Sequence, residues 1–346
     1  MTTSTSGHPA AQYLSDLINS FWAAPVVSVA AELGIPDRLA HGPQDAATLA
    51  EACGAHAPAV FRLLRALVTL GLARETGGTR FALTEAGQLL RADVPGSQRG
   101  RALFTGDMLW KQFGDLGYVV RTGQRTRVMA SGPEGFAKLA EDPARLHAFQ
   151  MAMAEGSVRA ARAALAVHDF GRYRNVLDLG GGYGGVLTVL LEACPALRGA
   201  VLDLPYLESG AQAYLARAGV GARAGFLGGD FFAQVPSGFD AVVMKYIIHD
   251  WDDEPALRIL ANCRRAAQPD TRLLLLEQVV PERLGQERGD QAVIRADLTM
   301  MTVGGRERTA AEYAALFARS GWRPVGITAA GEGFSLIEAR PAEPAA

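Results

Sequence analysis

Two segments of this chain carry residues that could do chemistry together. The first, residues 176–184, runs from an apolar stretch into Asp178-Leu-Gly-Gly-Gly-Tyr-Gly, and glycines in such a turn let backbone approach a ligand closely. The second places His249 in the stretch Ile-His-Asp-Trp. A histidine, with an ordinary pKa of about 6.5, can accept a proton from a reacting group. The pair predicts an enzyme that holds a nucleoside-bearing donor and deprotonates an acceptor.

Residues at the ends of three other predicted strands strengthen the nucleoside site. Asp203 closes the second strand, where a carboxylate can accept hydrogen bonds from both ribose hydroxyls. Asp230 can bond the amino group of an adenine while Phe231 stacks on its ring, and Lys245 ends the fourth strand. The structural alternatives are a helix cap, a turn and a solvated charge, but their joint position at strand ends favours a cofactor. A dinucleotide is disfavoured because Asp178 opens a turn where a pyrophosphate needs a free helix N-terminus.

The second half of the chain predicts the sheet that would bring these residues together. Short apolar strands alternate with helices, which is typical of a parallel sheet covered on both faces, with right-handed crossovers. The predicted strands are Asn175–Leu179, Gly199–Leu204, Ala224–Leu227, Ala241–Tyr246 and Leu273–Val279, with helices near 184–193, 207–218 and 253–267. Trp322–Ile327 and Phe334–Ala339 predict a closing antiparallel hairpin. The predicted fold class is α/β, a Rossmann-like doubly wound sheet.

The first half of the chain predicts helices and a small wing. Thr48-Leu-Ala-Glu51 is a capping-box pattern that opens a helix. Residues 60–70 carry an apolar stripe at helical spacing, and residues 72–83 read as a hairpin around two glycines. Helix, helix, hairpin is a winged-helix pattern. Further helices are predicted at about 101–122 and 133–167.

Composition limits the class of protein. The net charge of −2, with acids and bases interspersed, argues against a polyanion-binding surface. Cys53, Cys194 and Cys263 are few and far apart, which disfavours a disulfide framework and predicts a reducing, cytoplasmic environment. We see no secretion-signal pattern at the N-terminus, and no apolar run approaches the roughly 20 residues of a membrane span. We therefore expect a cytoplasmic protein that binds neither nucleic acid nor membrane.

Several motifs together resemble those of class I S-adenosylmethionine-dependent methyltransferases. Within them the chain is similar to the small-molecule O-methyltransferases of the plant caffeate/flavonoid type and their bacterial natural-product relatives. The matching segments are 178–184, 202–205, 229–232, 245–251 and 304–309, and the likeness covers nearly the whole chain. The resemblance implies S-adenosyl-L-methionine as cofactor, S-adenosyl-L-homocysteine as product and no metal. The implied cofactor-binding residues are Asp178, Gly180, Gly182, Asp203, Leu204, Gly229, Asp230, Phe231 and Lys245.

The resemblance also implies a catalytic group of one histidine and two acids. His249 would be the general base, with Glu277 and Glu307 orienting it, because a carboxylate on one imidazole nitrogen leaves the other free to accept a proton. The structural alternatives are a salt bridge for Glu277 and a charge at a helix start for Glu307. Asp250 is predicted to cap the helix at 253, and Trp251 to pack. No cluster in the sequence has the spacing of a metal site.

A set of aromatic and sulfur side chains is predicted to hold a planar aromatic acceptor. These residues are Trp110, Phe113, Phe136, Phe149, Met153, Met300 and Met301. Taken singly, each is as consistent with ordinary core packing. The predicted activity is methylation of a phenolic hydroxyl in secondary metabolism, and the alternatives are C- or N-methylation or a non-methylating activity on the same fold.

The resemblance implies a homodimer formed through the N-terminal domain, with partly exchanged helices. A DNA-binding regulator is disfavoured because only Arg62 and Arg65 lie on the would-be recognition helix. The predicted organisation is a disordered N-terminus (1–11), a winged-helix-like dimerisation domain (12–100), a helical linker region contributing to the acceptor pocket (101–170), a catalytic domain (171–340) and a flexible tail (341–346).

Overall fold

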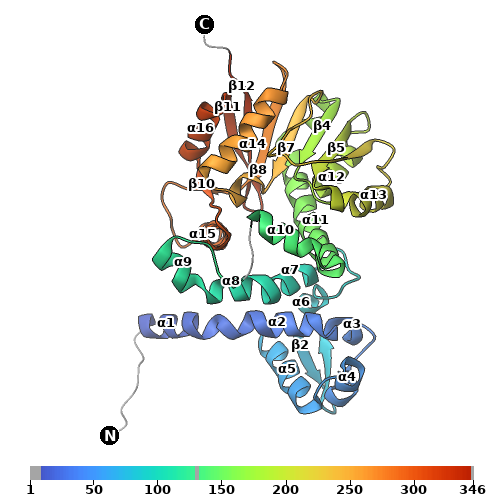
Figure 1. Cartoon of the computed structure of the whole chain (residues 1–346). Coiled ribbons are helices and arrows are strands. Elements are labelled where there is room, and N and C mark those ends of the chain that lie inside the picture. Colours follow the sequence, from blue (N-terminus) through green and yellow to red (C-terminus); the bar gives the residue numbers. More distant parts are fainter. Residues whose placement is uncertain (1–8, 129–131, 344–346) are drawn as a thin grey trace. The chain divides into compact units, whose positions relative to one another are not determined.

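The chain forms two compact units, which divide between Lys111 and Gln112 (Figure 1). A computed structural model describes residues 9–128 and 132–343 of the sequence.

The first unit contains the predicted winged-helix arrangement. Its helices are α1 (Pro9–Asn19), η1 (Ser20–Trp22), α2 (Ala23–Glu32), α3 (Ile35–Leu39), α4 (Ala46–Cys53), α5 (Ala57–Thr69), α6 (Glu85–Gln88), α7 (Arg99–Phe104) and the π-helical η2 (Thr105–Leu109). Strands β1 (Gln44–Asp45), β2 (Ala73–Thr76) and β3 (Arg80–Leu83) form an antiparallel sheet in the order β1-β3-β2. The apolar stripe predicted on residues 60–70 buries Val60, Leu64 and Leu67 against Leu49 and Phe81.

Three local expectations were wrong. Helix α4 begins at Ala46, and its N-cap is Asp45, whose carboxylate accepts the N–H of Thr48 at 2.9 Å; the extended backbone of Asp45 suits a cap, whereas Thr48 is already helical. Helix α1 begins at Pro9, inside the segment 1–11 expected to be disordered, and residues 1–8 lie outside the described residues. Pro341 pairs with Trp322 in the last strand instead of starting a tail.

The helical stretch Pro9–Glu32 corrects the expectation that no segment could reach across a membrane. Its length and its mean hydropathy of 1.3 over 18 residues meet that requirement, and it is the one such helix among the described residues. Its large exposed side chains recur on one face of α1 and η1: Tyr13, Leu14, Leu17, Ile18 and Phe21. A membrane span is apolar all round, whereas an apolar stripe on one face is typical of a helix that packs against a partner.

The second unit is a seven-stranded sheet with helices on both faces. Its strands are β4 (Asn175–Leu179), β5 (Arg198–Asp203), β6 (Ala224–Gly228), β7 (Ala241–Lys245), β8 (Arg272–Glu277), β11 (Trp322–Gly331) and β12 (Phe334–Pro341), in the order β11-β12-β8-β7-β4-β5-β6. All neighbours are parallel except β12, which runs antiparallel to both β8 and β11. A separate two-stranded ladder joins β9 (Val279–Val280) to β10 (Arg308–Thr309). The predicted doubly wound sheet with a closing hairpin is confirmed.

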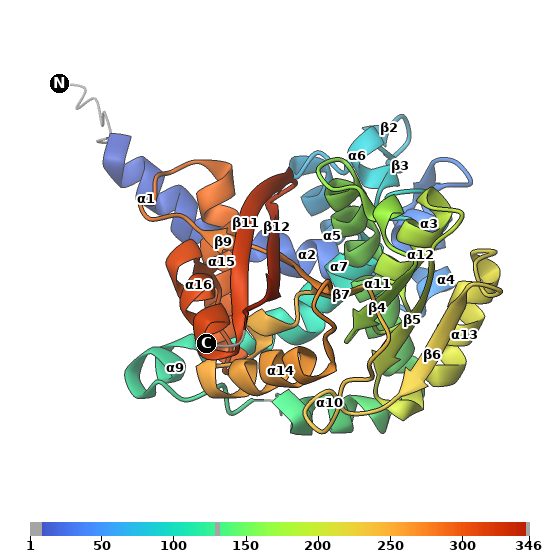
Figure 2. The ribbon, with the colours of Figure 1, turned by 90° about the horizontal axis from the view of Figure 1, so that it is seen from above.

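The helices of the second unit cover both faces of this sheet (Figure 2). They are α9 (Leu116–Thr122), α10 (Gly132–Ala140), α11 (Pro143–Leu165), η3 (Phe170–Arg172), α12 (Gly185–Ala193), η4 (Pro205–Leu207), α13 (Glu208–Arg217), η5 (Ile248–Asp250), α14 (Asp253–Ala266), α15 (Arg288–Val303) and α16 (Ala310–Arg319), while α8 (Trp110–Gly114) starts in the first unit. Helices α11 and α12 pack on the face that contains Val176 and Val243, and α14 and α16 pack on the face that contains Leu177 and Val242. The alternation of side chains along each strand therefore builds two cores.

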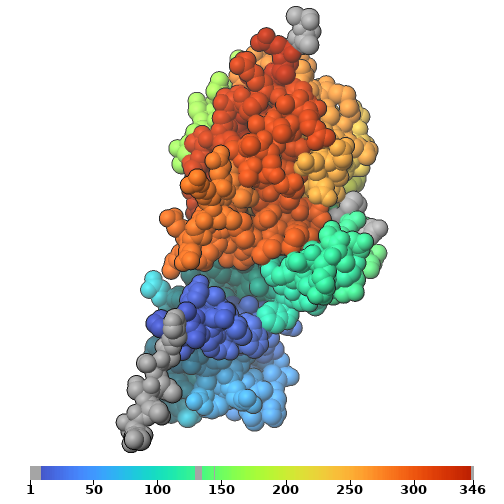
Figure 3. All heavy atoms as spheres, turned by 90° about the vertical axis from the view of Figure 1, so that its left-hand side faces the viewer, coloured from blue at the N-terminus to red at the C-terminus, as the bar shows by residue number. Residues whose placement is uncertain are grey.

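The strand order fixes where a ligand can bind in the second unit. From β4 the chain moves to β5 and β6 on one side of the sheet, and then returns to β7 and β8 on the other. In such sheets the crevice at the carboxyl ends of the strands, where the order reverses, is the usual binding site. The C-terminal segments, drawn orange to red, gather on one face of this unit (Figure 3).

Candidate active site

The turn after β4 requires glycine. Gly180, Gly182 and Gly184 have φ angles of 70°, 57° and 86°, a region that other residues avoid. A Cβ on Gly181 would lie 2.5 Å from the carboxyl group of Asp178. Asp178 is buried and accepts the N–H of Leu187 at 3.3 Å. Burial, together with the charge of Asp203, raises the pKa of Asp178 to about 7.

Asp203 ties the glycine turn to the end of β5. Its carboxylate accepts the N–H of Gly182 and the N–H of Leu204, each at 2.7 Å, so Asp203 does not act as a helix cap. Burial raises its pKa, and the two N–H donors oppose that effect. Each carboxylate oxygen keeps a second lone pair that could accept a hydroxyl group.

The segment after β6 lies against the same turn. Gly229 donates its N–H to the backbone carbonyl of Asp203 at 2.9 Å. Asp230 accepts the N–H of Phe232 at 2.8 Å, so the turn expected as its structural alternative is present. A ring carbon of Phe231 lies 3.6 Å from the position of a Cβ on Gly180. The ring of Phe231 therefore lies beside the glycine backbone, and the carboxylate of Asp230 is held in the adjoining turn.

Lys245 closes β7 at the switch point. Its ammonium lies 4.2 Å from the centre of the Tyr246 ring, which is within cation–π distance. Burial lowers the pKa of Lys245 to about 8, although the charges of Glu277 and Asp250 favour its protonated form.

These residues fit a cationic nucleoside cofactor. Five buried or half-buried carboxylates gather around these strand ends, together with the ammonium of Lys245 and the imidazole of His249; the acids are Asp178, Asp203, Asp250, Glu277 and Glu307. A sulfonium centre placed here would relieve repulsion between like charges. The glycine turn leaves room that a Cβ would fill, and Asp203 has free lone pairs for a ribose. S-adenosylmethionine matches both the charge and the backbone of this site.

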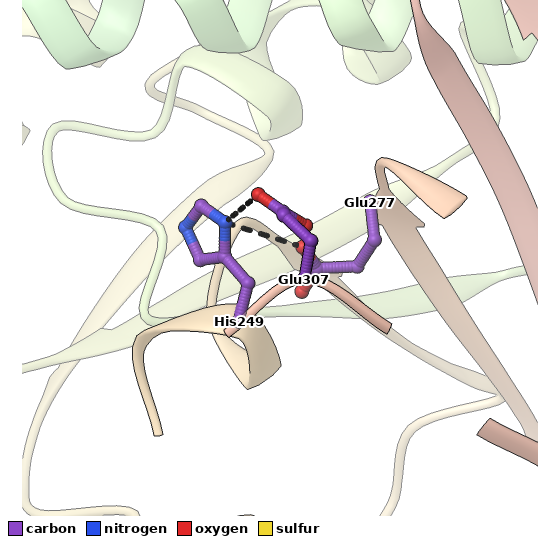
Figure 4. Close-up of side chains that lie close together, drawn as sticks. All are labelled: His249, Glu277 and Glu307. Atoms are coloured by element: carbon purple, nitrogen blue, oxygen red, sulfur yellow. Dashed lines mark hydrogen bonds and ion pairs between the residues drawn. The ribbon is translucent and has the colours of Figure 1, made fainter. Parts of the chain in front are cut away.

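His249 is brought together with the two predicted glutamates (Figure 4). It lies in η5, just after β7, and only 6% of it is exposed. Its Nδ1 is 2.8 Å from Oε1 of Glu307 and 3.9 Å from Oε2 of Glu277. A carboxylate at Nδ1 holds the proton on that nitrogen and leaves Nε2 as the acceptor.

Glu277 is fixed at the carboxyl end of β8 and is completely buried. Its Oε1 accepts the N–H groups of Ile247 and Ile248 at 3.2 and 3.0 Å. Its Oε2 has no hydrogen-bond partner among the described residues and faces the histidine. Burial raises the pKa of Glu277 to about 7, while the charge of His249 opposes the rise.

Glu307 lies on a loop that is attached to the backbone of the histidine. Gly304, with φ at 95°, ends α15. The N–H of Arg306 then donates to the carbonyl of His249 at 2.8 Å, and the N–H of Glu307 donates to Oδ1 of Asp297 at 2.9 Å. The Thr309–Glu312 capping box predicted at the start of α16 is present. The backbone of the Glu307 loop is therefore fixed both to His249 and to Asp297.

The charges around His249 favour its protonated form. Burial alone would lower its pKa, but Glu277, Asp250 and Glu307 together raise it to about 9. Asp250 was expected to cap the helix at 253, and this was wrong. The N-cap of α14 is Asp252, and Oδ1 of Asp250 lies 3.4 Å from Nε2 of the histidine. Trp251 packs edge-on against Phe232, as expected of a packing residue.

A cavity of about 300 Å³ borders the loop of Glu307. It is lined by Val280, Asp297, Met301, Gly305, Arg306, Glu307, Thr309 and Glu312. Of the predicted acceptor residues, Met301 lies in this cavity and Met300 precedes it on α15. The remaining predictions in the second unit are half-buried: Phe113 on α8, Phe136 on α10, and Phe149 and Met153 on α11. Trp110 belongs to the first unit and is 45% exposed.

Four residues at the site escaped the sequence prediction. Gln150 of α11 lies against the glycine turn, since its Oε1 is 2.4 Å from the position of a Cβ on Gly182. Tyr246, Asp250 and Asp297 contact His249 or the backbone of Glu307. Proximity in sequence to His249 was the only available signal for Tyr246 and Asp250, and none pointed to Gln150 or Asp297.

His249 and the two glutamates also form a group that could hold a metal ion. The spacing of these residues in the sequence did not indicate such a group. The potential ligand atoms of His249, Glu277 and Glu307 lie within 4.8 Å of one another.

Comparison with known proteins identifies two families in the chain. A model of the O-methyltransferase dimerisation domain matches residues 15–93, and a model of the O-methyltransferase domain matches residues 113–323. Phenazine O-methyltransferase PhzM of Lysobacter antibioticus is 36% identical over 334 residues, which are 96% of this chain and 97% of that protein.

Solved structures give the same result. The structure of LaPhzM is 35% identical, has a TM-score of 0.90, and is matched over 96% of this chain and 100% of its own. The O-methyltransferase NcsB1 from neocarzinostatin biosynthesis was solved with S-adenosylmethionine and 2-hydroxy-5-methyl naphthoic acid. It is 33% identical, with a TM-score of 0.79 and matches over 92% of this chain and 96% of its own.

Proposed function

Because this chain belongs to the S-adenosylmethionine-dependent O-methyltransferases, we propose that it methylates the phenolic hydroxyl of an aromatic small molecule in secondary metabolism, with His249 as general base. The observation that carries the proposal is the histidine's hydrogen bonding. Glu307 occupies Nδ1 at 2.8 Å, and this leaves Nε2 to accept a proton.

The role of His249 follows from the chemistry of the acceptor. A phenol has a pKa of about 10 and is mostly neutral at pH 7, so a neighbouring base makes its oxygen a better nucleophile. Nε2 takes the phenolic proton, and the negative charges of Glu307 and Glu277 then stabilise the imidazolium. Both carboxylates are buried, and both are positioned before the proton arrives: the Glu277 carboxylate accepts two backbone N–H groups, and the backbone N–H of Glu307 donates to Asp297.

The cofactor is held by the residues at the ends of β4, β5, β6 and β7. When bound, S-adenosylmethionine supplies an electrophilic methyl group on a positively charged sulfur. Asp203 would accept the ribose hydroxyls, Asp230 and Phe231 would hold the adenine, and the glycine turn would let the cofactor approach the backbone closely. The surrounding carboxylates attract the cation.

The acceptor class rests on a relative and on the predicted pocket. NcsB1 was solved with a hydroxylated naphthoic acid, and the residues predicted here to face the acceptor are mainly aromatic rings and methionines. Flat apolar walls of this kind suit a planar aromatic ring. We propose Phe113, Phe136, Phe149, Met153, Met300 and Met301, all in the second unit, as that pocket.

Substitution of His249 tests the base. His249→Ala should lower kcat by about 10²–10⁴-fold and leave the affinity for S-adenosylmethionine near wild type, because His249 is not one of the proposed cofactor-binding residues. His41→Ala, an exposed histidine in the first unit, is the control and should leave turnover unchanged. A His249→Ala enzyme with wild-type kcat would show that positioning alone drives the transfer.

An acceptor screen tests the substrate class and the metal prediction together. Phenols, anilines and activated carbon acceptors are offered with the cofactor, and mass spectrometry detects the added methyl group. We expect transfer to phenols, unaffected by EDTA, because the proposed mechanism needs only His249 to take the phenolic proton. Loss of turnover in EDTA that is restored by one metal would contradict the metal-free mechanism, and transfer to anilines alone would contradict the oxygen acceptor.

We also propose that the protein is a homodimer in the cytoplasm, paired through the first unit. Residues 15–93 match a dimerisation domain, and α1 has no buried residue of its own. The exposed stripe of Tyr13, Leu14, Leu17, Ile18 and Phe21 therefore needs a cover, and a second copy of the same helix supplies one.

A further inference from the structure

Tyr246 has an unusual backbone conformation. Its φ is 55°, and the other non-glycine residues with positive φ in the described chain, Thr79 and Glu332, lie in exposed hairpin turns. A bulky aromatic residue rarely adopts this conformation, because its Cβ approaches the following carbonyl oxygen. Tyr246 instead lies directly after β7, three residues before His249, in the half-buried centre of the site.

This conformation makes the turn that supports Glu277. The N–H of Tyr246 still donates to the carbonyl of Leu276 in β8 at 3.2 Å. The chain then reverses, so that the next two N–H groups, of Ile247 and Ile248, both reach Oε1 of Glu277. With Oε1 held in this way, Oε2 is the oxygen that faces His249. The turn could be made by glycine without strain, so the turn alone does not explain a tyrosine.

The ring of Tyr246 supports the histidine itself. It stacks on the imidazole, with the ring centres 4.5 Å apart and the planes inclined by 26°. Its hydroxyl accepts a hydrogen bond from Nε2 of Gln278 at 2.8 Å, which anchors the ring to the residue after Glu277. Phe334 of β12 lies 5.3 Å from the same ring. The tyrosine is thus fixed on its far edge and presents a flat face to the imidazole.

We propose that Tyr246 is a positioning residue for the transfer: its turn directs Glu277, and its ring holds the His249 imidazole in the plane where Nδ1 meets Glu307 and Nε2 faces the acceptor. This inference rests on the proposed role of His249 as base. The face of a tyrosine ring is also electron-rich and stabilises a neighbouring cation, so the stack favours the imidazolium that forms when the proton is taken. Tyr246 touches neither reacting atom, and it acts through the histidine.

Two substitutions distinguish the contribution of the Tyr246 ring from the contributions of its hydroxyl and of the backbone turn. Tyr246→Phe keeps the stack and loses one hydrogen bond, so kcat should stay within about fivefold of wild type. Tyr246→Asn tolerates positive φ and keeps the turn, but it removes the ring. We expect kcat to fall by about tenfold to a hundredfold, with the KM for S-adenosylmethionine little changed.

The control removes a similar stack elsewhere in the same unit. Tyr173 stacks on His168, with planes inclined by 17°, just before the start of β4 and so at the opposite end of the sheet. Tyr173→Asn should lower the melting temperature but leave kcat per folded molecule and its pH profile unchanged. If the loss of activity in Tyr246→Asn only reflected weaker folding, Tyr173→Asn would lose activity to a similar extent.

NMR titration of the His249 imidazole gives a readout that does not depend on turnover. Loss of the stack should lower the pKa of His249 by about half a pH unit in Tyr246→Asn, and Tyr246→Phe should restore the wild-type value. Asp250, Glu277 and Glu307 also face this imidazole and are unchanged in all variants. An unaltered titration and an unaltered kcat in Tyr246→Asn would overturn the proposal, and so would a Phe variant as impaired as the Asn variant. If His249→Ala retains full activity while the titration still responds to Tyr246, then the base proposal fails and the positioning contact stands.

Discussion

The backbone N–H of Arg306 donates a hydrogen bond to the backbone carbonyl of His249 at 2.8 Å. This bond joins two segments that are far apart in the sequence, and it lies next to the side-chain bond between the histidine and Glu307. The main chain therefore holds the two residues next to each other, within reach for their side chains to meet.

Gly305→Ala should disrupt this arrangement. A Cβ on Gly305 would lie 2.1 Å from the carbonyl oxygen of His249 and 2.6 Å from the carbonyl carbon of Asp250, so the loop must move away and carry Glu307 with it. Displacement of an orienting group by about 1 Å can cost a factor of about 10² in rate. We expect kcat to fall by that order, with cofactor affinity near wild type in calorimetry. Gly289→Ala, whose Cβ would meet nothing within 4 Å, is the control, and equal rates for the two variants would contradict the prediction.

The pH dependence of kcat/KM should show the raised pKa of His249. The free enzyme's base is protonated at neutral pH, so the rate should rise with pH towards an inflection near 9. Glu307→Gln removes a charge and a hydrogen bond that favour the imidazolium, so the inflection should move to lower pH while the maximal rate falls. Initial-rate measurements from pH 6 to pH 10 check both effects. An inflection that stays in place in Glu307→Gln would show that another group controls the profile.

Asp178→Asn should stabilise the cofactor-free protein at alkaline pH. The pKa of Asp178 is raised by burial from 3.8 to about 7, so its preference for the protonated form contributes stability below pH 4 that is lost as pH rises to 7. The variant does not titrate. Its stability relative to wild type should therefore grow between pH 4 and pH 7, by up to about 4 kcal/mol, and then level off. Urea unfolding at several pH values measures this, and a difference that does not change with pH would refute it. Affinity for the cationic cofactor should fall in the same variant.

Charges placed on the apolar face of α1 should separate the dimer. Leu17 and Ile18 are 53% and 64% exposed in a single chain, and glutamates at both positions would bury charge in the proposed interface, which is costly. We expect the mass from light scattering to halve. Val325→Glu, on the edge strand β11 and 53% exposed, should leave the mass unchanged. A wild-type protein that is already monomeric, or one that partitions into lipid vesicles, would contradict the proposed pairing.

Local patterns were enough to predict the sheet and the glycine turn. Strand periodicity and turn glycines act over a few residues, and the carboxyl ends of parallel strands must meet at one edge, so Asp178, Asp203 and Lys245 could be grouped from the sequence. The observed strands differ from the predicted ones by one or two residues at most ends, except that β11 extends to Gly331.

Side-chain direction could not be predicted in the same way. Asp250 and Asp252 both precede α14 and have the same chemistry, yet one faces the imidazole and the other becomes the N-cap. Tyr246, which precedes both, has a positive φ that contradicts the preference of tyrosine. Asp297 contacts the backbone of Glu307 from the middle of a helix, and only the packing of α15 brings it there. Where tertiary contacts overrule local preference, the sequence carries no readable signal.

The place of β12 in the sheet has a consequence for the synthesis of the protein. This strand, the last in the chain, lies between β8 and β11 and pairs Ser335 with Glu277. While the nascent chain is still attached to the ribosome, β8 has an open edge beside that acid, since domains begin to fold during translation. The edge of β8 beside Glu277 therefore stays open until β12 has been synthesised and has paired with it. Translation that stalls before β12 would leave an exposed apolar strand edge, which is prone to aggregation.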